Sequence, residues 1–413
     1  MKNINLKIIY IDVGSTMIKI AESRGTTIVK RTFIQRNLNK KVGDEVAEII
    51  NKLKSKYPNV KFKICSSANG GLRVGLISLT KRFSGEISKR IIMSSGCNLI
   101  WHASSNEFEN LNVKIDALVI SGGLNVKNAK YQKLWMKNVI EHIPSNIPVI
   151  YCGNSFLKNI ILKKLPNANI IENIMNDNIK INYLELSSSL KQLYMLDLIQ
   201  KDGISNLQEH SIIPIWPTPA ICQNAFLKIT EHKTHMHFSQ PILMIDMGGA
   251  TTDVFYGKEL ISNINELKAE ALSINRYVYT SIGVKSSKES VIIELNENKF
   301  LYDIINCISE ENQTQKRYIN FRDNELSWIS EEDLFYMCFG IVLEKLVNGI
   351  ESGHPIVLEK INTIIITGGA SKKCKIEILN KIYKLYLGDK ITNSPEIFID
   401  KKYEIWNIGI ATL

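Results

Sequence analysis

The sequence has no pair of cysteines in a C-x-x-C arrangement, although it contains 7 cysteines among 413 residues. An odd number of widely spaced cysteines excludes a framework of paired disulfides and is typical of reduced cytosolic thiols. No stretch approaches the about 18 uninterrupted apolar residues of a membrane-spanning helix, and the first residues lack the apolar segment of a signal peptide. We therefore expect a cytoplasmic protein with no membrane partner.

The sequence also lacks runs of basic residues interleaved with aromatic ones. Its formal net charge of +10 and its pI near 9.0 would on their own suggest nucleic-acid binding. However, the lysines are spread along a chain that is also rich in isoleucine and asparagine, so compositional drift accounts for the charge. Nucleic acid is accordingly not an expected partner.

The pattern of apolar residues predicts an α/β protein. A length of 413 residues suggests two or more domains. Short apolar runs that end in glycine alternate with helical patterns, which favours α/β layers with ligands beyond the carboxyl ends of the strands. Residues 212–220 contain three prolines, so we interpret them as an ordered connector between two domains, not as a central strand or a helix.

Residues 243–256 are the most informative stretch, and they read LMIDMGGATTDVFY. An apolar run carrying Asp246 is followed by two glycines, two threonines and a second carboxylate, Asp253, which predicts a strand, a tight turn and a strand. A charge in a buried strand needs a partner or a metal ion. Gly248 and Gly249 would let backbone N–H groups approach a ligand. Carboxylate, amides and hydroxyls together suit a magnesium–phosphate group.

The same pattern occurs near the N-terminus, where residues 12–16 read DVGST and a second strand containing Lys19 follows. Either hairpin alone is equally compatible with an ordinary glycine turn beside a surface aspartate. Two of them predict a duplicated domain with a ligand between its halves. A third glycine segment, TGGA at 367–370, follows a β-branched run and precedes a predicted helix, an arrangement that favours a phosphate or nucleoside.

Taken in order, the three segments at 12–16, 246–253 and 367–370 resemble the phosphate-1, phosphate-2 and adenosine motifs of the superfamily of actin, heat-shock chaperones and sugar kinases (ASKHA). This resemblance implies an α/β fold with two ribonuclease-H-like (actin-like ATPase) lobes and a nucleotide cleft between them. Residues 1–219 would form the N-terminal lobe, with a helical insertion, and residues 220–413 the C-terminal lobe.

A narrower resemblance is carried by CSSANGGL at 65–72, ISGG at 120–123, PVIYCGN at 148–154, WPTPA at 216–220 and GGATTDV at 248–254. These segments look like the glutamate mutase MutL (GlmL) family, and the similarity runs from about residue 7 to the C-terminus. Members of that family are regarded as accessory or reactivating factors of adenosylcobalamin-dependent mutases.

The sequence departs from the family pattern at two places. After ISGG the family continues with Thr-Asp-Gly-Gly, whereas this chain has LNVK at 124–127. Where the family shows Glu-Gly-Asp-Leu-Gly, this chain has YTSIG at 279–283 and so lacks two carboxylates. If those carboxylates support magnesium or water, ATP hydrolysis would be weak or absent.

The resemblance implies an ATPase that acts on a protein partner, with ATP and Mg²⁺ as cofactors. Asp12 and Asp246 would be the catalytic and metal-binding carboxylates, holding magnesium directly or through water. Lys19 would neutralise phosphate charge or have a structural role. The nucleotide would further contact the remaining motif residues, which are Gly14, Ser15, Thr16, Gly248, Gly249, Ala250, Thr251, Thr252, Asp253, Gly368, Gly369 and Ala370.

In this interpretation, nucleotide exchange or hydrolysis changes the angle between the lobes and opens a mutase that carries damaged cobalamin. Two alternatives stay open. One is a small-molecule kinase of the same fold, for which the sequence shows no distinct acceptor signature. The other is a nucleotide-binding scaffold without turnover, which the missing carboxylates near residue 279 favour. The sequence leaves open the mutase, the oligomeric state and the role of the loop at 65–75.

Overall fold

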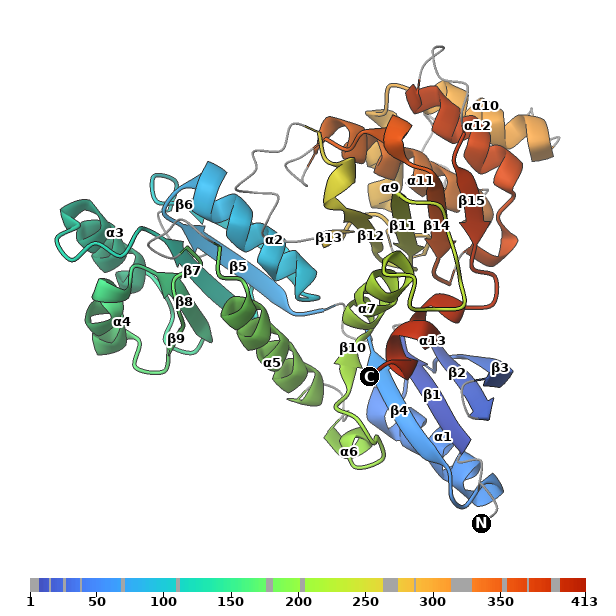
Figure 1. Ribbon diagram of the computed structural model, residues 1–413, viewed down its shortest axis with the longest axis horizontal. Helices are drawn as coiled ribbons and strands as arrows, with labels where there is room; N and C mark the ends of the chain where they lie inside the picture. Colours follow the sequence, from blue (N-terminus) through green and yellow to red (C-terminus); the bar gives the residue numbers. More distant parts are fainter. Residues whose placement is uncertain are drawn as a thin grey trace. The chain divides into compact units, whose positions relative to one another are not determined.

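The computed structural model describes residues 7–14, 16–24, 27–37, 39–67, 71–108, 112–175, 181–200, 205–262, 274–285, 287–312, 329–350, 355–369, 371–387 and 394–413. The chain is a mixed α/β protein with three five-stranded sheets (Figure 1). It divides into two compact units. The first contains residues up to Ile221 and the C-terminal residues Ile410–Leu413, and the second contains the described residues between Cys222 and Gly409.

The first sheet of unit 1 has the strand order β10-β4-β1-β2-β3. Its antiparallel part is β1 (Lys7–Val13), β2 (Met17–Arg24) and β3 (Thr27–Gln35), and its parallel part adds β4 (Lys61–Ser66) and β10 (Trp216–Pro217) to β1. Helix α1 (Val42–Lys56) connects β3 to β4. Its apolar side chains Val46 and Ile50 join Ile9 and Ile11 of β1 in one buried cluster, which holds the helix against the sheet.

A second sheet is inserted between β4 and β10, and all its strands are parallel, in the order β6-β5-β7-β8-β9. The strands are β5 (Arg73–Ser78), β6 (Asn98–Ser104), β7 (Ala117–Gly122), β8 (Val149–Gly153) and β9 (Asn169–Ile170). The helical segments are η1 (Lys81–Gly85), α2 (Glu86–Ser94), α3 (Lys130–Glu141), η2 (Ser155–Leu157), α4 (Lys158–Lys164), α5 (Leu184–Gln200) and α6 (Ser205–Gln208). Figure 1 shows α2 and α5 on one face of this sheet and α3 and α4 on the other.

Unit 2 is built on the sheet β13-β12-β11-β14-β15. Its strands are β11 (Ile242–Met247), β12 (Thr252–Gly257), β13 (Ile274–Tyr279), β14 (Thr363–Thr367) and β15 (Glu396–Ile399). The helical segments from the unit boundary onward are α7 (Thr218–Thr230), η3 (Lys258–Leu260), α9 (Lys288–Asn296), α10 (Leu301–Asn312), α11 (Glu331–Asn348), η5 (Leu358–Lys360), η6 (Ser371–Lys373), α12 (Ile376–Leu387) and α13 (Glu404–Ala411).

The sheet of unit 2 repeats the topology of the first sheet of unit 1. In each, an antiparallel meander of three strands is extended beside its first strand by two parallel strands, which gives the order 3-2-1-4-5. This is the ribonuclease-H-like arrangement, so the predicted α/β fold with two such lobes is confirmed. The assignment of residues 1–219 and 220–413 to these lobes stays a prediction.

The proline-rich segment 212–220 is more regular than predicted. Trp216 and Pro217 form the short edge strand β10, and α7 begins at Thr218. An edge strand tolerates proline because one side of its backbone makes no ladder. Pro219 lies in the first turn of α7, where its missing N–H costs no intrahelical hydrogen bond. Residues 216–217 thus form an edge strand and not a central one, whereas the exclusion of a helix is wrong for residues 218–220.

Among the helices in the described part of the chain, none combines the length and the apolar character that crossing a bilayer requires.

His102 in β6 makes the stability of the inserted sheet depend on pH. Its Nε2 lies 2.8 Å from Oγ of the fully buried Ser78. Burial, with help from the charges of Lys81 and Lys89, lowers the pKa of His102 from 6.5 to about 4. Between these two pH values the unfolded chain binds a proton that the folded chain does not. The stabilising contribution is complete above about pH 6.5 and is lost as the pH falls towards 4.

We expect His102→Gln to make the free energy of unfolding fall less steeply between pH 6.5 and pH 4, since the variant has no imidazole to protonate. Urea unfolding at a series of pH values measures this slope. His235→Gln, at an exposed loop position, is the control and should keep the parent's slope. Equal slopes for His102→Gln and the parent would contradict the prediction.

Candidate functional site

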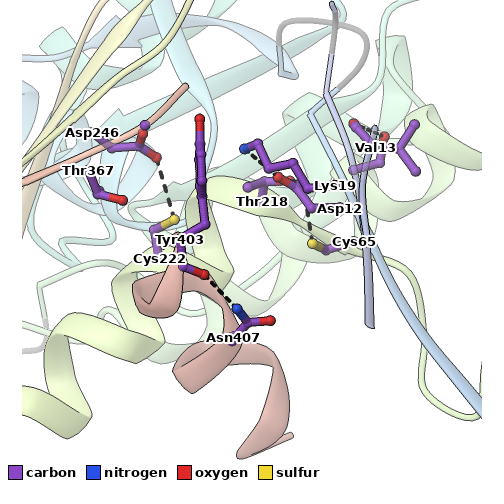
Figure 2. A network of polar contacts seen from close by, with 12 residues as sticks. Asp12, Val13, Lys19, Cys65, Thr218, Cys222, Asp246, Thr367, Tyr403 and Asn407 are labelled. Carbon is purple, nitrogen blue, oxygen red and sulfur yellow. Dashed lines mark hydrogen bonds and ion pairs between the residues drawn. The ribbon is translucent and has the colours of Figure 1, made fainter. Parts of the chain in front are cut away.

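Asp12 lies near the end of β1 and is fully buried. Its Oδ1 accepts a hydrogen bond of 2.6 Å from Oγ1 of Thr218, and its Oδ2 is 2.7 Å from Nζ of Lys19 in β2 (Figure 2). The thiol of Cys65, its neighbour in β4, lies 3.5 Å from Oδ1. Burial raises the pKa of that thiol well above its ordinary value, so Cys65 is a neutral donor. The charge of Asp12 is thus balanced by Lys19.

The turn after Asp12 is closed by a hydrogen bond of 2.9 Å from the N–H of Gly14 to the carbonyl of Met17. Gly14 is required because a β-carbon there would lie 2.9 Å from the same carbonyl oxygen. The carbonyl of Thr16 accepts from the N–H of Arg36, which fixes the turn to β3. Ser15 lies outside the described residues.

The second hairpin is closed in the same way. The N–H of Gly248 donates a hydrogen bond of 2.9 Å to the carbonyl of Thr251, and Asp246 again stands two residues before the glycine. Asp246 is partly exposed, and its Oδ2 lies 3.5 Å from the thiol of Cys222 in α7 (Figure 2). The two predicted phosphate turns therefore share one backbone design.

The segment after β13 supports the second turn, which the sequence did not indicate. The carbonyls of Gly248 and Gly249 accept from the N–H groups of Val284 and Lys285, at 3.2 and 2.8 Å. Oγ of Ser287 donates to the carbonyl of Ala250 at 2.6 Å. Three successive carbonyls of the turn are therefore held from one side. The one sequence feature that could have pointed to this contact is Gly283, where a β-carbon would overlap the backbone of Ala250.

Thr252 and Asp253 stand in β12 and have partners inside unit 2. The buried hydroxyl of Thr252 donates to the carbonyl of Ile282 at 2.9 Å. Asp253 is directly opposite Asp246 in the β11–β12 ladder and forms an ion pair of 2.5 Å with Nη2 of the buried Arg276 in β13. Burial raises the pKa of Asp253, and the charge of Arg276 opposes that shift.

The third glycine segment follows β14, the parallel neighbour of β11, with Thr367 next to Asp246 in register. Gly368 has a φ of +100°, and a β-carbon there would overlap the carbonyl of Met247 and lie 2.7 Å from Oδ1 of Asp246. Because Gly368 has no side chain, this segment can approach Asp246 closely. A β-carbon on Gly369 would lie 2.9 Å from the hydroxyl of Tyr403. Ala370 lies outside the described residues.

The segment is anchored through Asp400. Its Oδ2 accepts hydrogen bonds from Oγ1 of Thr367 at 3.0 Å and from the N–H of Ile405, and its Oδ1 accepts from the N–H of Glu404. Asp400 is buried, which raises its pKa in spite of these donors. Asp400 therefore joins the end of β14 to the start of α13.

Within unit 2, the structure brings Asp246 and Gly368 together with the turn at 248–251. Within unit 1 it brings Asp12 and Lys19 together with the turn at 14–17. A family model described as MutL protein matches residues 8–412, which include all of these elements. The chain belongs to the MutL protein family. The predicted resemblance to the glutamate mutase MutL family is thereby confirmed.

A relative in this family is the protein MutL of Clostridium tetanomorphum. It is 25% identical over 262 residues, which are 60% of this chain and 56% of that protein. The match thus spans little more than half the length of the relative.

Solved structures with some similarity have low scores. Nucleotide-free acetone carboxylase is 10% identical, with 89% of this chain and 66% of that chain covered and a TM-score of 0.37. Glycerol kinase of Plasmodium falciparum with ADP is also 10% identical, with 98% and 88% covered and a TM-score of 0.36. TM-scores this low do not assign a fold, which is defined here by the order and direction of the strands.

The Arg276–Asp253 pair gives a test of the second hairpin's electrostatics. Arg276→Met removes one partner and leaves a carboxylate buried without its counter-charge, which costs about 3–5 kcal/mol in comparable buried pairs. We expect a loss of unfolding free energy of that order, measured by urea denaturation. The double change Arg276→Met with Asp253→Asn should lose less.

The control for this prediction is Lys40→Met, which breaks the exposed 2.8 Å pair of Lys40 with Glu48. Solvent screens that pair, so its loss should change stability little. If Arg276→Met were as stable as the control, Asp253 would not depend on Arg276 for its burial.

Proposed function

We propose that this chain is an ATP-dependent accessory factor that reactivates an adenosylcobalamin-dependent mutase, with glutamate mutase as the first partner to test. The observation that carries the proposal is the match of the MutL family model to residues 8–412. Two carboxylate hairpins of identical closure lie inside that range and support a nucleotide-binding role.

The glycine positions fit a phosphate chain. Gly14, Gly248 and Gly368 stand where any larger side chain would meet backbone or carboxylate oxygens. The two hairpins and the segment after β14 therefore keep bare backbone beside Asp12 and Asp246, and bare backbone amides and glycine turns are what phosphate sites use. In this proposal Gly249, Ala250 and Thr251 contact the phosphates, and Gly369 borders the adenosine.

The carboxylates fit magnesium only in the presence of other oxygen ligands. Across the described ranges, no three histidine, cysteine, aspartate or glutamate side chains gather as a metal site. Magnesium is commonly held by one or two carboxylates, with phosphates and water completing its shell. Asp246 is the partly exposed carboxylate and would hold the ion, which when bound would neutralise charge on the phosphates.

Asp12 has a different part in this proposal. Its two oxygens are engaged by Thr218 and Lys19, so it positions the lysine and reaches a metal ion only through water. Lys19 then neutralises phosphate charge from the first hairpin. Asp246 orients the attacking water or accepts its proton.

A scaffold that binds nucleotide without turnover is the second candidate function. The observation in its favour is the enclosed state of Asp12, since a fully buried carboxylate paired with lysine is not poised to activate water. The sequence YTSIG at 279–283, which lacks the family's two carboxylates, points the same way.

The reactivation proposal predicts nucleotide-dependent rescue. We expect glutamate mutase inactivated by damaged cobalamin to regain activity when this chain, MgATP and intact cofactor are added together. The rate of mutase turnover is the measurement, and omission of ATP is the control. No rescue with ATP, for any adenosylcobalamin-dependent mutase of the same cell, would sink the proposal. A kinase would instead consume ATP only with a small-molecule acceptor.

The assignment of Asp246 predicts a separation of turnover from binding. Asp246→Asn should lower ATP hydrolysis by about 100-fold or more, the usual effect of losing a positioned acid or base. Nucleotide binding, followed by calorimetry with ATP, should persist. Asp303→Asn, at an exposed site in α10, is the matched control and should behave as the parent. Undiminished hydrolysis by Asp246→Asn would exclude a catalytic role, whereas ATP binding without hydrolysis in the parent would favour the scaffold.

A further inference from the structure

The inserted sheet has its own topological switch point. In the order β6-β5-β7-β8-β9 the chain first moves from β5 to β6 and then from β7 outward through β8 and β9, so the direction changes between β5 and β7. Helix α2 accordingly packs on one face, with Ile87 and Ile91 in one core. Helix α3 packs on the other, with Trp135 and Met136 in another (Figure 1). Sheets of this order bind ligands outside the carboxyl ends of the strands at that point.

In this chain the crevice at the switch point is filled by the chain itself. A β-carbon on Gly122, at the end of β7, would lie 2.7 Å from Oγ of Ser84 and 2.8 Å from Cβ of Leu79. Ser84 and Thr80 bond to each other through side chain and backbone at 3.2 Å. The N–H of Leu79 donates to the carbonyl of Ser121. The carboxyl edge between β5 and β7 is therefore a closed surface.

The loops at this edge are fastened to one another. Oγ of Ser105 donates to the carbonyl of Leu79 at 2.9 Å, which ties the loop after β6 to the loop after β5. Nδ2 of Asn154 donates to the carbonyl of Val126 at 2.9 Å, and the N–H of Ser155 donates to Oδ1 of Asn125 at 2.9 Å. The loops after β7 and β8 are thus joined as well. The backbone that carries the side chains of these loops is therefore held in place.

These fixed loops display apolar side chains to solvent. We call a group of five exposed apolar residues the carboxyl-edge face. Each of them is between 36% and 58% exposed, and they are Phe83, Leu124, Val126, Tyr131 and Phe156. They come from η1, from the loop after β7, from the first turn of α3 and from η2. Clustered, ordered apolar groups of this kind mark an interaction site more often than singly scattered ones do. Aromatic anchors in particular contribute most to protein interfaces.

The same loops also carry basic residues. Five exposed cations stand in these loops and helix starts, and they are Lys81, Arg82, Lys127, Lys130 and Lys158. The acidic residues in the described loops and helix starts here are the half-buried Glu86 and the exposed Glu107, and Glu107 is 3.0 Å from Nζ of Lys81. The loops that carry the face therefore have more basic than acidic side chains. The complement of this face is an apolar surface that also carries acidic residues.

We propose that the carboxyl-edge face docks an acidic protein surface, and that in the proposed function this surface belongs to the mutase. The inference rests on the proposed function for the identity of the partner. A protein is favoured over a nucleic acid because Leu124 and Val126 are exposed members of the face and offer nothing to phosphates or base edges. The filled crevice also favours a macromolecule over a small ligand.

The test uses full-length chains and purified glutamate mutase from the same cell. Two double variants change the face, Leu124→Ser with Phe156→Ser and Lys127→Glu with Lys130→Glu. Two controls make the same kinds of change elsewhere, Leu196→Ser on the exposed side of α5 and Lys137→Glu on the exposed side of α3. The readouts are the Kd for the mutase, rescue of the inactivated mutase, and the Kd for ATP.

We expect each face variant to bind the mutase at least tenfold more weakly and to rescue it less, with ATP affinity unchanged. The charge-reversal variant should also lose the parent's sensitivity to salt. If the parent rescues the mutase and the face variants do so equally well, the docking proposal is overturned and the proposed function stands. If the parent neither binds nor rescues any mutase, both fail.

Two further arms address other occupants of the face. Vesicles containing phosphatidylglycerol and a single-stranded DNA are offered to the parent and to both face variants. Binding of either that is lost in the face variants, without mutase binding, would overturn the assignment to a protein partner. Mutase binding that neither the vesicles nor the DNA displaces would support a protein partner.

Discussion

The burial of Asp12 is the constraint on which unit 1 depends. A carboxylate removed from water costs several kcal/mol unless it is paired and hydrogen-bonded, and here Lys19 and Thr218 meet that requirement. Lys19 is seven residues away across a hairpin, whereas Thr218 is 206 residues away. The hydrogen bond from Thr218 therefore fixes the start of α7 against β1. The chain between β4 and β10, which includes the inserted parallel sheet, therefore begins and ends close to Asp12.

The two hairpins place different charges on the same backbone. In the first, the residue opposite Asp12 is Lys19, so the pair is neutral. In the second, the residue opposite Asp246 is another aspartate, Asp253, whose charge is met by Arg276 from the next strand. Asp246 is partly exposed, whereas Asp12 is fully buried. The first carboxylate therefore stands opposite a lysine and the second opposite another carboxylate, although the two turns are closed by equivalent hydrogen bonds.

A structural feature could be predicted from the sequence only where the residues that form it lie close together along the chain. Both hairpins were predictable because the carboxylate, the glycine turn and the returning strand are consecutive residues. The third glycine segment was recognisable for the same reason. By contrast, no local pattern pairs Thr218 with Asp12 or Arg276 with Asp253, because these contacts depend on the strand order. The carbonyl bonds from residues 284–287 to the second turn were missed likewise. The prolines of 212–220 misled only about the start of α7, because the first turn of a helix accepts proline.

Glycines at the ends of strands have opposite consequences in different sheets of this protein. In the two ribonuclease-H-like sheets, Gly14 and Gly248 turn the chain back into an antiparallel strand, which leaves bare backbone beside a carboxylate. In the inserted sheet, Gly122 and Gly153 let neighbouring segments pack onto the strand ends, since a β-carbon on Gly153 would lie 2.5 Å from the carbonyl of Gly122. Because this crevice is closed, the exposed apolar side chains of the carboxyl-edge face stand on the loops around it. The same residue type thus returns the chain beside a carboxylate in one sheet and lets segments pack onto strand ends in another, so a glycine motif alone does not distinguish the two arrangements.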